Sequence, residues 1–306
     1  MDINAVTAQE SWQSLAQMHR EGEQEQEDPQ VDKTPDGSSA LGRVIANPQV
    51  FTVVVALMMG LTFWLPRDVL TVAAVAVVVG FSLGWAQLLR LPSQRGTGVV
   101  IALFGIVSVL AVRIYPDLAI VTEVAGVGIL GAFIAEILRG KDRPQLVASV
   151  AGTIAGLLIA LTAGVYSVLG SQKEWHFLVL PAALILVAGA LVQYLPKSWS
   201  PNLRGFLSVA IAGAAGLVVG LVIMLLGVAE GANVFLFQWA PWPGAISGAL
   251  VGASLGVIVG LTWWALMWLF DDELAPKTVF ASFTLGTVPV LALVLPVYAM
   301  ARLLGA

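Results

Sequence analysis

The chain has 306 residues, of which 58% are hydrophobic and 11% are charged, and it contains no cysteine. Soluble domains carry about a quarter charged residues, so this composition excludes an ordinary soluble protein and predicts that most of the chain lies in lipid. The lack of cysteine excludes disulfides, thiolate metal sites and cysteine nucleophiles. We expect the lipid bilayer as the main partner, and no nucleic acid.

The formal net charge of −4 is divided unevenly, because residues 1–46 hold nine acidic and three basic residues. This segment is polar and cannot bury enough apolar surface to offset its chain entropy. We therefore predict a disordered, acidic cytoplasmic tail over residues 1–46 and a transmembrane helical domain over 47–306. The tail has no apolar run that would serve as a cleavable signal. Two interpretations stay open: a solvated tail, or a docking site for a cytoplasmic or membrane protein partner.

Beyond Pro48 the chain divides into apolar runs, each close to the roughly 20 residues that cross about 30 Å of hydrocarbon. The predicted fold class is all-α, a polytopic bundle of about nine transmembrane helices. Their expected positions are 48–65, 68–89, 97–115, 117–138, 145–169, 175–195, 204–228, 241–269 and 279–304. The tight turn at Pro116 leaves a second interpretation open, in which the third and fourth spans form a re-entrant pair.

The distribution of Lys and Arg predicts the orientation. If the tail is cytoplasmic, eleven of the fifteen basic residues fall on the inner side and four on the outer side. The positive-inside rule then predicts an N-terminus in the cytoplasm and a C-terminus outside. Tryptophans cluster near the expected span ends, as membrane-interface residues do. We expect a multi-pass protein of the plasma membrane.

Glycine recurs at every fourth position from Gly244 to Gly260, including Gly248, Gly252 and Gly256. In an apolar helix such glycines let another backbone approach closely. Spans seven and five carry similar small residues at the same step, which predicts that spans five, seven and eight form one close-packed centre. Two roles stay open for these glycines: packing alone, or lining a path for a substrate.

Span nine contains Pro289 and Pro296, seven residues apart. Each proline removes one backbone hydrogen bond and bends the helix. Thr284 and Thr287 are close enough in sequence to satisfy the freed carbonyls. A bent helix is either a moving element or an ordinary feature of a membrane protein.

Glu123 is the one ionisable residue predicted well inside a span, and Arg113 lies across the short turn at Pro116. Intramembrane ionisable residues are functional candidates. Glu123 is either a protonatable site that couples a proton to transport or a structural carboxylate. In the structural interpretation it pairs with Arg113 or reaches water near the surface.

Two charged stretches lie on the predicted cytoplasmic side. The stretch from Glu136 to Arg143 either binds an anionic lipid headgroup or only fixes the orientation. The acidic run Asp271, Asp272 and Glu273 either holds magnesium for phosphoryl chemistry or is a solvated loop. His176 stands alone and makes no transition-metal site. No catalytic motif is recognisable, so we expect no cofactor, no metal and no catalytic residue.

These observations favour a permease-type protein that moves a neutral or lipid-like molecule, because the spans carry few polar residues for a hydrophilic cargo. The alternative is a non-catalytic scaffold or accessory subunit of an envelope or respiratory complex, contacted through the tail. A membrane lipid-modifying enzyme is the third hypothesis. The candidate functional residues are Glu123, Arg113, Gly248, Gly252, Gly256, Pro289 and Pro296.

Overall fold

The computed structural model describes residues 47–139, 145–172, 176–191, 199–225, 244–269 and 278–303. These residues form α-helices and include no strand. The helices are α3 (Pro48–Thr62), α4 (Arg67–Leu88), α5 (Gln94–Ile114), α6 (Leu118–Leu138), α7 (Leu146–Leu161), α8 (Ala163–Leu169), α9 (His176–Leu191), α10 (Pro201–Leu225), α12 (Gly244–Leu269) and α13 (Val279–Leu303).

Seven helical stretches in the described part of the chain are long and apolar enough to cross a membrane, with α7 and α8 counted as one. The helices α3 and α9 are also apolar but shorter. The chain is therefore a multi-pass, all-helical membrane protein, as its composition predicts. The count of nine spans and the orientation of the termini stay predictions, and the tail lies outside the described residues.

Local sequence explains several helix boundaries. Asn47 caps α3 by accepting a hydrogen bond of 3.1 Å from the Gln49 amide, and Pro48 follows at the first helical position, where its missing N–H costs nothing. Asp117 caps α6 in the same way, through the Ala119 amide at 3.0 Å. Between α5 and α6, Tyr115 is extended, as the residue before a proline prefers. The two helices at Pro116 are each long and apolar enough to cross a membrane, which favours two separate spans over a re-entrant pair.

The fifth predicted span is broken at Thr162 into α7 and α8. Near the break the amides bond three residues back rather than four, from Thr162 to Ile159 and from Val165 to Thr162. Ser108 of α5 donates a hydrogen bond of 3.1 Å to the Leu161 carbonyl. A Cβ on Gly164 would lie 2.4 Å from the Ser108 hydroxyl, so the close approach of α5 requires glycine there.

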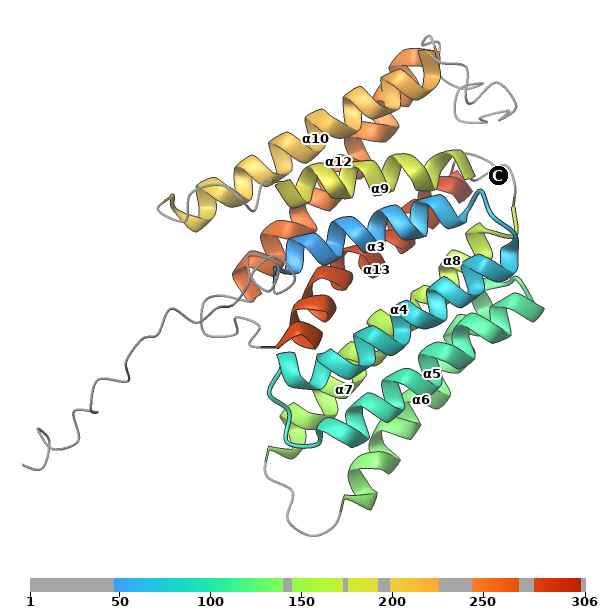
Figure 1. Ribbon diagram of the computed structural model, residues 1–306, viewed down its shortest axis with the longest axis vertical. Helices are drawn as coiled ribbons and strands as arrows, with labels where there is room; N and C mark the ends of the chain where they lie inside the picture. Colours follow the sequence, from blue (N-terminus) through green and yellow to red (C-terminus); the bar gives the residue numbers. More distant parts are fainter. Residues whose placement is uncertain are drawn as a thin grey trace, which may run out of the picture. The chain divides into compact units, whose positions relative to one another are not determined.

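The helices α4 and α13 form the interior, since 61% of each spanning window is buried. The last helix, α13, packs against α3, α4, α7, α8, α9 and α12. Figure 1 shows α3 and α13 between the helices α9, α10 and α12 and the group from α4 to α8. At the periphery, α6 has 11% and α10 has 22% of its window buried. Their outward surfaces therefore suit contact with lipid.

The predicted single centre of small-residue helices is wrong. The glycine-rich helices α10 and α12 pack against each other, but α7 packs against α4, α5 and α6. The reason is visible at Gly156, where a Cβ would lie 2.3 Å from the indole nitrogen of Trp85. The glycines of α7 make room for large side chains of other helices, whereas those of α12 make room for a backbone.

Candidate functional site

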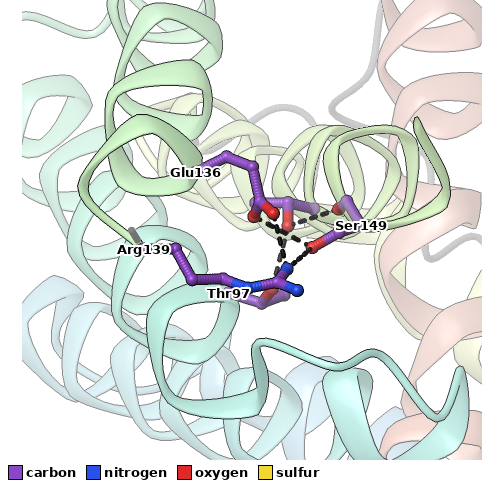
Figure 2. Close-up of polar contacts among 5 residues, drawn as sticks. Thr97, Glu136, Arg139 and Ser149 are labelled. Atoms are coloured by element: carbon purple, nitrogen blue, oxygen red, sulfur yellow. Dashed lines mark hydrogen bonds and ion pairs between the residues drawn. The ribbon is translucent and has the colours of Figure 1, made fainter. Parts of the chain in front are cut away.

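A buried ion pair lies near the end of α6 (Figure 2). The guanidinium of Arg139 donates from Nη1 to Oε1 of Glu136 at 2.5 Å. The side chains of Glu136 and Arg139 are only 7% and 15% exposed. Ser149 in the first turn of α7 donates to the second carboxylate oxygen at 3.0 Å and lies 3.4 Å from the same guanidinium nitrogen. The carboxylate thus has a partner on each oxygen.

Two buried threonines extend this network to a third helix. The hydroxyl of Thr153 donates to the Ser149 carbonyl at 2.8 Å and lies 2.9 Å from the hydroxyl of Thr97 in α5. Figure 2 shows the group where α5, α6 and α7 meet. Removing one partner of a buried charge pair leaves the other charge uncompensated, which costs far more than the net strength of the pair. This network therefore suits a structural role, in which it holds α5, α6 and α7 in position.

The sequence predicts Glu136 in the charged stretch that ends at Arg143, whereas in the structure its side chain is buried. The buried residues of α6 are Gly128, Ala132 and Glu136, which recur at a four-residue step and define the inward stripe of that helix. This stripe was the signal that could have found Glu136. Because Arg139 is engaged with Glu136, it adds little to any headgroup site on the loop. Lys141, Asp142 and Arg143 lie outside the described residues.

Glu123 and Arg113 are not brought together. Arg113 donates to Asp68 at 2.8 Å, so the expected pairing of Arg113 with Glu123 is wrong. Glu123 is exposed on α6 and makes no ion pair or hydrogen bond with the described residues. It lies on the side of the exposed Val127 and Leu130, which are 59% and 62% accessible. The carboxylate therefore belongs to the outward surface of α6.

The glycines of α12 lie directly against α10. A Cβ on Gly252 would lie 2.0 Å from the Gly216 carbonyl oxygen, and one on Gly256 would lie 2.1 Å from that of Ala212. The carbonyl oxygen of Gly248 is 2.1 Å from the position of a Cβ on Gly220. The pairing runs antiparallel, because residue numbers rise along one helix as they fall along the other. The described parts of both helices thus touch by backbone.

One side chain adds polar glue to this pair. Ser208 of α10 is fully buried and lies 2.9 Å from the Gly260 carbonyl of α12, to which it donates. Its hydroxyl also lies 2.7 Å from the Gly205 carbonyl in its own helix. Contacts this close leave no room for a substrate between the described residues of α10 and α12. The packing interpretation of Gly248, Gly252 and Gly256 therefore accounts for their surroundings.

Pro289 and Pro296 both lie inside α13. The two expected partners of the freed carbonyls bond elsewhere: Thr284 donates to Phe81 of α4 at 3.0 Å, and Thr287 donates to Phe283 in its own helix at 2.6 Å. Neither acceptor is the carbonyl four residues before a proline, so this expectation is wrong.

Neighbouring helices instead donate to other carbonyls of α13. Thr52 of α3 donates to Gly286 at 2.7 Å. Thr162 at the α7–α8 break and Tyr166 of α8 donate to Leu291 and Val290, at 2.9 and 2.8 Å. Each donor is buried. Three carbonyls within three residues of Pro289 thus accept hydrogen bonds from hydroxyls of α3, of the α7–α8 break and of α8.

A small apolar cavity of about 10 Å³ lies beside this helix. Side chains of α3, α8, α9 and α13 line it, including Met59, Tyr166, Leu186 and Val294. A volume of this size is at the lower limit for one water molecule, which would also need polar partners. The cavity is therefore a local packing defect beside α13 rather than a preformed site.

Among the described residues, the remaining candidates give no chemical site. No group of His, Cys, Asp and Glu that could hold a metal ion occurs within the described ranges. Asp271, Asp272 and Glu273 lie outside those ranges. No protein-family model matches the sequence, and comparisons with curated proteins and solved structures find no match either. What the chain does must be inferred from its own residues.

Proposed function

We propose that the chain is a permease of the plasma membrane that moves a neutral or lipid-like molecule across the bilayer. The observation that carries this proposal is the environment of α13. This helix contains Pro289 and Pro296, and it packs against six other helices in the interior. A change in its bend would be felt on both sides of the bundle.

The hydrogen bonds around α13 suit a helix that changes its bend. Thr52, Thr162 and Tyr166 donate to its carbonyls from α3, the α7–α8 break and α8. A hydroxyl can move between adjacent carbonyls near a proline, because the regular ladder is already interrupted there. Such exchange lets a helix bend without leaving a polar group bare in lipid. This supports α13 as the moving element.

The apolar surroundings of α13 support a neutral or lipid-like cargo, which would have to pass there when the helix moves. The residues around the cavity beside α13 are apolar except for the Tyr166 hydroxyl, which is engaged with Val290. A hydrophilic solute would lose its hydration there without finding new partners, which costs several kcal/mol per polar group. A neutral or lipid-like molecule avoids that penalty.

The test uses the full-length chain in liposomes that contain fluorescent NBD-phosphatidylcholine, with glycerol-driven swelling as a second arm. Dithionite quenches only lipid in the outer leaflet, so additional quenching reports movement between leaflets. We expect the protein to accelerate at least one of the two, and Pro289→Ala or Pro296→Ala to slow it several-fold without unfolding. Pro181→Ala in α9 is the matched control, because none of the hydroxyls named above donates to that helix.

Two results would contradict the proposal. One is that neither the lipid nor glycerol crosses faster than in protein-free liposomes. The other is that folded proline variants of α13 move the probe as fast as the unaltered chain, because the bend of α13 would then play no part.

One observation favours the scaffold or accessory-subunit function as a second candidate. Glu123 is exposed on α6 among apolar side chains, and a Cβ on the neighbouring Gly126 would meet nothing within 4 Å. A carboxylate facing lipid is costly, and a partner helix with a basic side chain would compensate it. Such a helix has room to approach at Gly126.

Mass measurement in mild detergent distinguishes this candidate. A scaffold should migrate as a complex larger than its own 32.1 kDa chain. Glu123→Gln should reduce the mass of that complex, and deletion of residues 1–40 should reduce it by more than the deleted residues themselves account for. Leu130→Ala on the same surface is the control for loss of apolar contact alone. An unchanged mass for Glu123→Gln, together with a decrease in the shortened protein no larger than the deleted residues, would argue against the scaffold.

A further inference from the structure

Three charged residues lie together at one end of α4 and α5. Arg67 and Asp68 begin α4, and Arg113 is in the last turn of α5. Asp68 and Arg113 form an ion pair at 2.8 Å, with 81% and 37% of their side chains exposed. Arg67 is repelled by Arg113 and attracted by Asp68. The group therefore contains two guanidinium groups and one carboxylate.

Arg67 has donors that the fold does not use. Its Nε and Nη2 atoms are buried, and they have no hydrogen-bond partner in the part of the chain that the structure describes. The nearest carboxylate on its own helix, Asp68, is already engaged with Arg113. A buried donor left without an acceptor costs about 1–3 kcal/mol, and more for a charged group. An acceptor from outside the described residues would satisfy these donors.

The surroundings favour an anion as that acceptor. Within the group of Arg67, Asp68 and Arg113, the two guanidinium groups exceed the one carboxylate, so the group itself carries a net positive charge. The start of α4 adds to it, because Pro66 precedes the helix without a side-chain cap and the first amides carry the positive end of the helix dipole. Guanidinium groups bind phosphate through paired, charge-assisted hydrogen bonds.

We propose that Arg67 and Arg113 bind a phosphate group at this end of α4 and α5, with Asp68 holding the Arg113 side chain in position. The site does not depend on the permease proposal. Its apolar border fits the headgroup region of a bilayer: Trp64 and Leu65 precede Arg67 and are 61% and 52% exposed, and Ile114 and Tyr115 follow Arg113 at 69% and 65%. Aromatic side chains prefer that depth.

The phosphate could belong to a phospholipid headgroup or be free in solution, and both sources share the same chemistry. The test measures binding of two probes to the full-length protein in a neutral detergent. One probe is short-chain phosphatidylglycerol, followed by native mass spectrometry and by the thermal midpoint. The other is inorganic phosphate, followed by the thermal midpoint alone. Chloride at equal ionic strength is the reference for both.

The decisive variant is Arg67→Gln, which keeps most of the side-chain length and removes the charge. The matched control is Arg95→Gln, because Arg95 is exposed at the opposite end of α5. We expect Arg67→Gln and Arg113→Gln each to weaken binding about tenfold, the effect of losing a charge-assisted hydrogen bond. Asp68→Asn should weaken it less, and Arg95→Gln should leave it unchanged.

The probes separate the two sources. Saturable, Arg67-dependent binding of phosphatidylglycerol with no response to inorganic phosphate assigns the site to a lipid headgroup. Arg67-dependent competition by inorganic phosphate assigns it to a free anion. Equal binding of both probes by Arg67→Gln and Arg95→Gln overturns the proposal, and so does the absence of saturable binding to the unaltered protein.

Discussion

The α10–α12 pair and the surroundings of α13 are two different ways to join apolar helices. Between α10 and α12 the backbones meet directly, for example at Gly216 and Gly252. Around α13, large residues remain, and the contacts are tied by hydroxyls such as Thr162 and Tyr166 that donate to its carbonyls. Lipid gives no hydrophobic driving force between helices, so each region must use close packing or hydrogen bonds.

These two kinds of contact, backbone to backbone and hydroxyl to carbonyl, differ in how much movement they allow. A backbone-to-backbone contact has one register, because a shift brings a side chain against a carbonyl. A hydroxyl-to-carbonyl contact near a proline is a single hydrogen bond, and the hydroxyl can change acceptor where the regular ladder is interrupted. We therefore expect α10 and α12 to behave as one rigid piece, and α13 to be the element whose neighbours tolerate change.

The largest effect is expected from a methyl group added between α10 and α12. In Gly252→Ala the new Cβ would lie 2.0 Å from the Gly216 carbonyl oxygen, so the helices must separate. We expect the free energy of unfolding to fall by about 3 kcal/mol, or the protein not to fold. Denaturation in detergent by circular dichroism measures this.

Gly126→Ala is the matched control on α6, because its Cβ would meet nothing within 4 Å. Alanine is the better helix former by about 1 kcal/mol, so this variant should be unchanged or slightly more stable. Equal effects at Gly252 and Gly126 would show that helix propensity, and not backbone contact, governs both positions.

The next largest effect is expected at the ion pair of Glu136 and Arg139, where α5, α6 and α7 meet. In Glu136→Gln, the largely buried Arg139, whose side chain is 15% exposed, loses its charge partner. We expect a loss of about 2–3 kcal/mol of unfolding free energy, below the full cost of breaking a deeply buried pair because Arg139 is partly exposed. The same denaturation measurement applies.

Asp68→Asn supplies the exposed counterpart, since Asp68 is 81% exposed in its pair with Arg113. It should cost less than about 1 kcal/mol. The double variant Glu136→Gln with Arg139→Gln should recover part of the loss. If it is worse than the sum of the single variants, the network does not act through charge compensation.

A smaller loss of unfolding free energy is expected for the hydrogen bonds that hold α13. Tyr166→Phe removes one hydroxyl donor to Val290 and keeps the ring. We expect a loss of about 1 kcal/mol, the usual net contribution of one hydrogen bond, in the same denaturation assay. Thr287→Val is the control, because that hydroxyl donates within its own helix. A larger loss for Thr287→Val would mean that bonds between helices do not hold α13.

The smallest effect is expected at Glu123, which has no contact to lose among the described residues. Glu123→Gln should change the unfolding free energy by less than about 0.5 kcal/mol, as exposed substitutions do. A clear loss of stability for the purified, monomeric protein would contradict the outward placement of this carboxylate.

The sequence predicts the helical segments well because their length and hydropathy are set by the bilayer. It predicts their partners less well. A glycine stripe indicates that something approaches closely but not what does, and the Trp85 ring fills the space at Gly156 where a backbone was expected. Nearness in sequence suggests Glu123 as one possible partner of Arg113, whereas the partner in the structure, Asp68, is 45 residues away.

The two acidic residues of α6 show why the buried site is harder to predict from the sequence than the fold is. The sequence predicts Glu123 well inside a span and Glu136 in a charged stretch at the span end, but the helix turns Glu136 inward on the stripe of Gly128 and Ala132. Burial depends on which side of the helix faces the bundle. Only packing against α5 and α7 decides that.

The central position of α13 also has a consequence for biosynthesis. Helices enter the membrane in order from the ribosome, and α10 and α12 are close enough along the chain to pair early. The hydroxyl of Thr52 in α3, by contrast, reaches a carbonyl 234 residues further on, at Gly286. Contacts between distant segments form late and leave intermediates exposed. The first helices must therefore wait, incompletely packed, until α13 is synthesised, which makes this stage the one at which a chaperone or quality-control protease would act.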